Sequence, residues 1–198
     1  LLFFFYHRSD GAARPKYRHL AGKRQKEYNR RQDESGRKEE RGMERHGMDE
    51  ERKETEKENW KQSLISSALG ALERAYAPYS GFHVAAALLC GDGSVFTGCN
   101  VENASYPAGI CAERSAFSAA VSSGKREFTA IAIVGGRDGK TESYCAPCGI
   151  CRQVMREFCR PDEFLILLAR TPEDYKEYTL EELLPESFGP ENLTGSKD

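Results

Sequence analysis

The chain has 198 residues and a mass of 22.2 kDa, with 39% hydrophobic residues, 30% charged residues and a mean hydropathy of -0.66. This length suits one domain of ordinary size and excludes a large multidomain protein. Residues 1–58 hold 16 of the 29 basic and 13 of the 31 acidic side chains, which leaves 13 basic and 18 acidic side chains in 59–198. A net charge of about -5 on that second part argues against a nucleic-acid-binding surface and favours a small, neutral substrate.

The first 58 residues differ in character from the rest. Charges of both signs alternate from Arg14 to Glu58 without a sustained apolar period, so this segment cannot bury enough apolar surface to offset its ordering entropy. We predict a disordered, charged extension over 1–58 and a folded domain over 59–198. A nucleic-acid-binding arm is the alternative for the extension, because its net charge is about +3.

Three features bear on the cellular compartment. No apolar run approaches the roughly 18 residues that cross a bilayer, so no membrane span is predicted. The apolar start, Leu1 to Tyr6, is shorter than the core of a signal peptide and is followed by no small-residue cleavage site. Seven cysteines is an odd number, and three of them fall within seven residues, which favours free thiols that bind metal in a reducing compartment. We therefore expect a cytoplasmic protein.

The periodicity from Trp60 onward predicts the elements of an α/β fold. Apolar residues from Leu64 to Ala75 recur at helical spacing, and Pro78 with Gly81 ends this first helix. Residues 82–89 are short and almost wholly apolar, as in a strand buried on both faces, and a glycine-rich turn at 91–93 leads into a second strand at 94–99.

The second half repeats the order of helix and strand. A helix is predicted from Cys111 to about Ser123, a strand at 130–134 closed by Gly135 and Gly136, and a helix from Cys148. Strands at 164–168 and near 175–179 follow. This order implies a sheet, parallel in part, between layers of helices.

The motifs Cys111-Ala-Glu113 and Pro147-Cys148-Gly-Ile-Cys151 both fall at predicted helix starts. Cys148 and Cys151 are three residues apart and share one side of a helical turn, and Cys111 would come from the neighbouring helix. Three cysteines suit zinc and leave its fourth position open, as in catalytic rather than structural sites. The helix N-termini would also lower the pKa values of the thiols.

Glu113 stands two residues after Cys111 and is a poor fourth ligand, yet a carboxylate there can move protons at a water on the metal. A histidine or cysteine two residues before a glutamate, followed by Pro-Cys-x-x-Cys, is the pattern of zinc-dependent deaminases of nucleobases. A structural site closed by Cys145 as a fourth ligand is the alternative, but it leaves Glu113 unexplained.

Three further motifs are Tyr79-Ser-Gly-Phe82, Gly98-Cys-Asn-Val-Glu-Asn-Ala-Ser-Tyr-Pro107 and Phe188-Gly-Pro190. Together with the cysteine motifs, they resemble those of the small homotetrameric cytidine deaminases of pyrimidine salvage. The motifs occur in the same order as in that family and span about residues 60–193. The resemblance implies a three-layer α/β/α sandwich with a mixed five-stranded sheet. It also implies roles for the matching positions. Cys111, Cys148 and Cys151 would hold Zn²⁺, and Glu113 would be the proton shuttle. Phe82 would pack against the base, Asn100 and Glu102 would bind the ribose 3′-hydroxyl, and the Ala112 backbone would contact the pyrimidine edge. Tyr106 and Phe188 would reach into a neighbouring subunit's site.

The implied reaction is the hydrolytic deamination of cytidine and deoxycytidine to uridine and deoxyuridine, with release of ammonia. Zinc with three thiolates carries a formal charge of about -1, so Arg114 is predicted to compensate it. A polynucleotide-editing deaminase, a deaminase of another nucleoside and a non-enzymatic zinc module are the alternatives. The expected partners are a nucleoside and three further copies of the chain, with no nucleic acid and no membrane. Cys145 is an extra thiol near this site and is a candidate for oxidation.

Overall fold

The computed structural model describes Arg30 and residues 59–194, and the latter belong to one compact unit. The predicted extension over 1–58 lies outside the described residues, apart from Arg30. A helix of residues 59–71 opens the unit and tightens into the 3₁₀ turn η1 (Leu72–Arg74). This is the first helix that the apolar spacing predicts.

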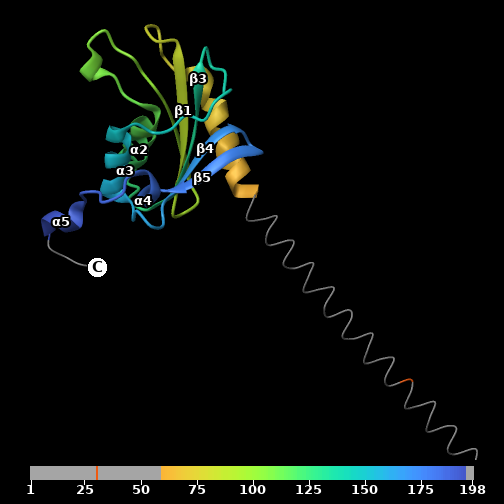
Figure 1. Ribbon diagram of the computed structural model, residues 1–198, viewed down its shortest axis with the longest axis vertical. Helices are drawn as coiled ribbons and strands as arrows, with labels where there is room; N and C mark the ends of the chain where they lie inside the picture. Colours follow the sequence, from red (N-terminus) through yellow and green to blue (C-terminus); the bar gives the residue numbers. More distant parts are fainter. Residues whose placement is uncertain (1–29, 31–58, 195–198) are drawn as a thin grey trace, which may run out of the picture. The chain divides into compact units, whose positions relative to one another are not determined.

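The centre of the unit is a five-stranded sheet with the strand order β2-β1-β3-β4-β5 (Figure 1). Its strands are β1 (Phe82–Cys90), β2 (Val95–Cys99), β3 (Phe128–Arg137), β4 (Leu165–Thr171) and β5 (Asp174–Thr179). Only the β3–β4 pair is parallel, and the other three pairs are antiparallel. The predicted mixed sheet is confirmed, including its fifth strand.

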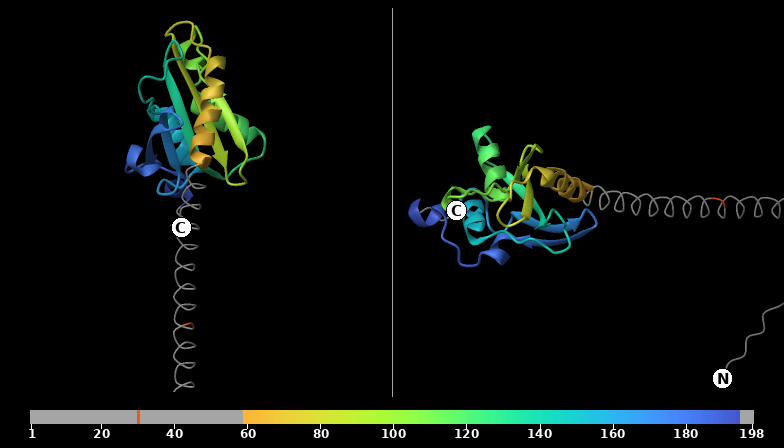
Figure 2. Two further views of the ribbon diagram at one scale, coloured as in Figure 1. Left: turned by 90° about the vertical axis from the view of Figure 1, so that its right-hand side faces the viewer. Right: turned by 90° about the horizontal axis from the view of Figure 1, so that it is seen from above.

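Helices cover both faces of the sheet (Figure 2). The helix of residues 59–71 packs Leu64, Ile65 and Ala68 against small side chains of β1 and β3. On the opposite face, α2 (Ala112–Ser122) and α3 (Gly149–Phe158) enclose a second core around Phe117 and Met155. Because β1, β3 and β4 alternate their side chains between two apolar layers, the sequences of these three strands are largely apolar. The three-layer sandwich is confirmed.

The end of β3 differs from the prediction. The two glycines at 135 and 136 do not close the strand, which stays paired with β1 as far as Arg137. A Cβ atom on Gly135 would lie 2.8 Å from the carbonyl oxygen of His83, and one on Gly136 would lie 1.8 Å from that of Lys140. Gly135 therefore leaves room for the backbone of β1, and Gly136 leaves room for the turn that follows β3.

Two segments project from the sandwich (Figures 1 and 2). One is the arm between β2 and α2, which carries the 3₁₀ turn η2 (Tyr106–Ala108) at its end. The other carries α5 (Pro190–Thr194). The short helix α4 (Leu180–Leu183), between β5 and this segment, begins with a capping box between Thr179 and Glu182 and packs against the core through the buried Leu180. None of the helices in the described part of the chain is long and apolar enough to cross a membrane.

Candidate active site

Three thiols meet where two helices begin. Cys111 is the N-cap residue of α2, Cys148 is the N-cap residue of α3, and Cys151 lies buried in the first turn of α3. The Sγ atom of Cys148 lies 3.9 Å from that of Cys111 and 3.4 Å from that of Cys151. All three Sγ atoms lie within 4.8 Å of one another, and they form the one such cluster found among the described residues. Sequence spacing predicted this convergence.

The cluster fits a tetrahedral zinc ion. Zinc–sulfur bonds of about 2.3 Å in a tetrahedron separate the sulfur atoms by about 3.8 Å, which is close to the separations found here. Cys145 is not a member of the cluster, so the alternative of a site closed by four cysteines gains no support. The donor set therefore suits a zinc site with one open position.

Neighbouring donors stabilise negative charge on the cluster. A hydrogen bond from Cys151 is the main cause that lowers the pKa of Cys111 to about 5, and Arg114 adds to the effect. The same contact, followed by burial, raises the pKa of Cys151. Arg114 donates from Nη2 to the Cys111 sulfur at 3.8 Å and to the carbonyl oxygen of Gly109 at 3.2 Å. The Arg114 guanidinium therefore places a positive charge beside the Cys111 thiolate.

Glu113 is buried beside the thiols, with 4% of its surface exposed. Its position in the first turn of α2 directs it into the same pocket as Cys111 and Cys148. Burial is the main cause that raises the pKa of its carboxyl group. A carboxyl group whose neutral form is favoured in this way is suited to accept and release a proton during a reaction.

A pocket of about 620 Å³ opens above these groups, which is large enough for a nucleoside. Its wall brings together residues from the loop before β1, the start of β1, the projecting arm after β2, the start of α2 and the segment that leads into α3. The residues predicted from the sequence that line it are Phe82, Asn100, Glu102, Tyr106, Cys111, Ala112, Glu113, Arg114 and Cys148.

Asn100 and Glu102 make bonds that the sequence did not predict. The side chain of Asn100 accepts from the backbone N–H of Val84 and donates to the carbonyl oxygen of Phe82, both at 2.8 Å. The carboxylate of Glu102 accepts from backbone N–H groups of Tyr79 and Ser80. Both side chains therefore hold the segment that carries Phe82, in addition to facing the pocket.

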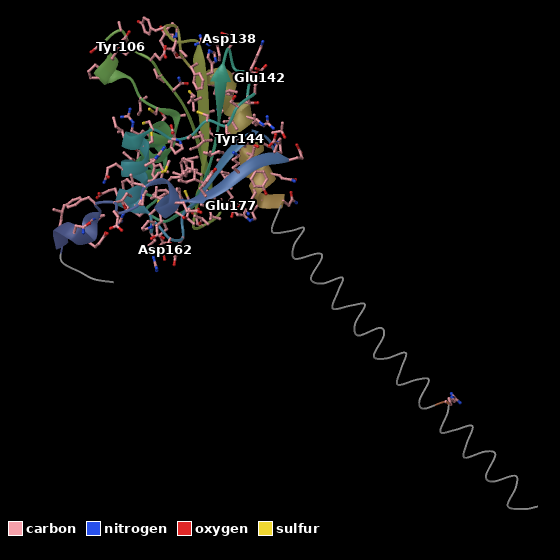
Figure 3. All side chains as sticks on the ribbon, in the orientation of Figure 1. Tyr106, Asp138, Glu142, Tyr144, Asp162 and Glu177 are labelled. Atoms are coloured by element: carbon pink, nitrogen blue, oxygen red, sulfur yellow. The ribbon has the colours of Figure 1, made fainter. Side chains whose placement is uncertain are left out.

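Two of the predicted residues lie at or beyond the edge of the pocket. Tyr106 stands at the end of the arm, 81% exposed (Figure 3). Phe188 is 58% exposed and does not line this pocket; its carbonyl oxygen accepts a hydrogen bond from Gln153. Neither is buried within its own subunit, and their predicted contacts with a neighbouring subunit stay a prediction.

Ser80, Gly98 and Cys145 also shape the site. Ser80 and Cys145 line the pocket. A Cβ atom on Gly98 would lie 2.4 Å from the carbonyl oxygen of Ala112, so only glycine lets β2 approach the start of α2 this closely. The sequence signal for Gly98 is a glycine inside a strand, which often marks close backbone approach. The sequence signal for Ser80 is its place in the motif Tyr79-Ser-Gly-Phe82.

A three-layer α/β/α sandwich that presents three thiols and a buried glutamate at adjacent helix starts defines a deaminase of the zinc-binding class. Residues 58–167 match the family model for the cytidine and deoxycytidylate deaminase zinc-binding region. The cytidine deaminase of Sporosarcina psychrophila is 45% identical over 133 residues, covering 67% of this chain and 94% of that protein. The cytidine deaminase of Halalkalibacterium halodurans is 47% identical over 133 residues, covering 67% and 97%.

Solved structures agree with these relatives. The crystal structure of cytidine deaminase from Burkholderia pseudomallei is 48% identical, with a TM-score of 0.58, and the match covers 64% of this chain and 97% of that one. The chain therefore belongs to the cytidine deaminase family.

Proposed function

We propose that this protein deaminates cytidine and deoxycytidine hydrolytically, consuming one water and releasing uridine or deoxyuridine and ammonia. The observation that carries the proposal is the buried Glu113 carboxyl group beside three clustered thiols in a pocket of nucleoside size. The names of the relatives and the family model support the same reaction.

The residues of this chain divide the chemistry among them. Cys111, Cys148 and Cys151 would hold zinc, which when bound supplies a Lewis acid that makes a water acidic near neutral pH. Glu113 accepts one proton of the attacking water and passes it to ring N3. It then accepts the proton of the new C4 hydroxyl group and delivers it to the amine, which leaves as ammonia when the C4–N bond breaks. Arg114 offsets the charge of the thiolates through its contact with the Cys111 sulfur.

The lining of the pocket favours a nucleoside over a nucleotide. Among the described residues that line it, Arg114 is the only lysine or arginine, and its guanidinium already contacts Cys111 and Gly109. Glu102 adds negative charge to the wall, so a 5′-phosphate would meet no free cation among these lining residues. The hydroxyl groups of ribose suit Glu102 and Asn100, Phe82 suits the face of a pyrimidine, and the Ala112 backbone suits the pyrimidine edge.

We also propose a cytoplasmic homotetramer that acts in pyrimidine salvage, with Tyr106 and Phe188 completing the site of a neighbouring copy. The exposure of these two aromatic rings supports a role outside their own subunit core. All seven cysteines lie among the described residues and are free thiols, which suits a reducing compartment.

The decisive assay follows the ultraviolet absorbance of cytidine on addition of the purified protein. We expect cytidine and deoxycytidine to be consumed with equimolar release of ammonia, and deoxycytidine 5′-monophosphate to survive. A chelator should stop turnover, and added zinc should restore it. Bound zinc without consumption of either nucleoside would contradict the proposal and would favour a non-enzymatic zinc module.

A further inference from the structure

The loop before β1 contains a serine whose hydroxyl group joins the side chain of Glu102 to the backbone of Phe82. Ser80 donates a hydrogen bond from Oγ to Oε1 of Glu102. The same Oγ accepts a hydrogen bond from the backbone N–H of Phe82 at 2.9 Å. A hydroxyl group has one hydrogen to donate, so these two contacts set its direction: it donates to Glu102 and accepts from Phe82.

These contacts leave the carboxylate of Glu102 with little freedom. Its Oε2 accepts from the backbone N–H groups of Tyr79 at 2.9 Å and Ser80 at 3.2 Å. A carboxylate offers about four acceptor positions, and three are taken here. The remaining one is on Oε1, the oxygen that Ser80 already contacts, so the serine determines where a further hydroxyl donor can bind.

The loop that carries Ser80 is itself held in place. Gly81 adopts a φ of 64°, a conformation that favours glycine, and its carbonyl oxygen accepts from the backbone N–H of Asp138 at 2.7 Å. Arg137 donates to the carbonyl oxygen of Ser80 at 3.1 Å. The contacts from Arg137 and Asp138 therefore restrain the backbone that presents the Ser80 hydroxyl group.

We propose that Ser80 is a positioning residue, which orients the Glu102 carboxylate toward a ribose hydroxyl and holds Phe82 at the pocket wall. The inference rests on the proposed function for the identity of its substrate. The ionised state that the serine requires of Glu102 is favoured, because the Ser80 hydrogen bond is the main cause that lowers the pKa of that carboxyl group.

The test compares two substrates, cytidine and 2′,3′-dideoxycytidine, which lacks the 2′- and 3′-hydroxyls. Ser80→Ala should lower kcat/KM for cytidine about tenfold, mainly through KM, because a hydrogen bond to a charged group is mispositioned. The value for dideoxycytidine should fall much less, because that substrate makes no bond to Glu102 and the bonds of Asn100 to Val84 and Phe82 still hold Phe82 in place. Ser80→Thr keeps a hydroxyl group and should restore most of the difference. An equal loss on both substrates, or no loss on either, would overturn the proposal.

Ser94 provides the matched control. Its Oγ donates to a carboxylate two residues away, that of Asp92, at 2.6 Å, in the turn between β1 and β2 and away from the pocket. Ser94→Ala should therefore leave both kcat/KM values unchanged, although it removes the same kind of bond.

A second measurement does not depend on turnover. Carbon-13 NMR titration of the Glu102 carboxyl group should place its pKa below the ordinary 4.5 in the wild type and higher in Ser80→Ala, with no change in Ser94→Ala. An unchanged titration in Ser80→Ala would overturn the positioning role. If the wild type did not consume cytidine, the proposed function would fail, and this titration would still decide whether Ser80 orients Glu102.

Discussion

Glu113 is buried although glutamate is among the residues least often found inside proteins without a charged partner. Its desolvation disfavours the charged form and raises the pKa of the carboxyl group. Burying this carboxyl group lowers the free energy of unfolding, and a catalytic role explains why a protein would retain it.

The exchange Glu113→Gln tests that role. The amide has the same shape but cannot carry a proton, so turnover of cytidine should fall at least about 10²-fold, the range associated with acid–base catalysis. The folded structure and the zinc content should be kept, as measured by circular dichroism and metal analysis. Wild-type turnover in this variant would refute the assignment of Glu113 as the proton carrier.

Substitutions at Cys145 and Cys148 test which of these two thiols binds the proposed zinc ion. Cys148 belongs to the thiol cluster, whereas Cys145 only lines the pocket, and burial raises its pKa to about 11. Cys148→Ala should therefore lose most bound zinc, because soft thiolate donors provide the affinity of such sites. Cys145→Ser should keep one zinc per chain in the same metal analysis. Zinc loss from both variants would revive the four-cysteine site.

At the scale of elements, the pocket depends on how closely β2 lies against α2. A Cβ atom at Gly98 would come within 2.4 Å of backbone atoms of both Ala112 and Ala116, and backbone cannot rotate away as a side chain can. The close approach carries Cys111 and Glu113 toward the end of the sheet, where the other residues that line the pocket lie.

Alanine substitutions at two glycines should have opposite effects. Gly98→Ala should destabilise the protein by about 1–3 kcal/mol, as overpacking does, and should also reduce activity by displacing α2. A Cβ atom on Gly70, in the helix of residues 59–71, would meet nothing within 4 Å, so Gly70→Ala should add about 0.5–1 kcal/mol through helix propensity. Thermal unfolding measures both, and a stable, active Gly98→Ala would contradict the packing argument.

The segment between β3 and Cys148 is tied to the β4–β5 hairpin through Tyr144. Its phenol donates a hydrogen bond to the carboxylate of Asp174. Arg170 and Lys176 lie over its ring, 5.1 Å and 4.7 Å from the centroid. This interaction restrains the loop that delivers Cys148 to the thiol cluster.

Tyr144→Phe keeps the ring and removes the hydrogen bond, which makes its effect dependent on pH. The Tyr144 hydrogen bond is the main cause that lowers the pKa of Asp174 below its ordinary 3.8. A lowered pKa stabilises the folded state above the unfolded value, and this contribution is lost as the pH falls through the folded value. The variant should therefore unfold at a lower temperature than the wild type at pH 7, and the gap should shrink below about pH 4. A gap that stays constant down to about pH 2 would contradict this account.

For the molecule as a whole, the C-terminal segment is held against α3 in a way that leaves the ring of Phe188 exposed. Arg156 of α3 is buried, donates to Ser187 at 2.9 Å and pairs with Glu191 of α5. These contacts fix the backbone on both sides of Phe188 while its ring stays exposed. A ring held in this way suits insertion into a second copy of the chain.

Mixing subunits tests whether sites are shared. Phe188→Ala and Glu113→Gln should each be nearly inactive alone, but a site with Glu113 from one chain and Phe188 from the other should work. Random co-assembly at equal amounts should restore about a quarter of wild-type activity, because that pairing arises at about one site in four. Leu193→Ala, on the exposed surface of α5, serves as the control and should stay active alone. Activity no greater than the sum of the separate variants would show that Phe188 does not serve another subunit.

Local patterns in the sequence determined much of this protein. Apolar runs predicted β1, β3 and β4, and helical spacing predicted the helices that cover the sheet, because a side chain's burial follows the period of its own element. The strand β2 was predicted from the glycine-rich turn before it, and the mostly polar β5 has no apolar pattern. The three cysteines and Glu113 were predicted as a group, since metal ligands at helix starts need characteristic residue types at short spacings. Even the meeting of Cys111 with Cys148 followed from the placement of both at helix starts.

The other contacts between segments far apart in the chain could not be predicted from the sequence and are seen only in the folded protein. The extension of β3 through Gly135, the hydrogen bonds of Asn100 and the link from Ser80 to Glu102 depend on backbone approaching from other elements. Glycine and serine can have several structural roles that the sequence alone does not distinguish. Contacts with backbone from other elements show which role each residue has. Periodicity reports which face of an element is buried, whereas distances between elements arise from the packing of the whole core.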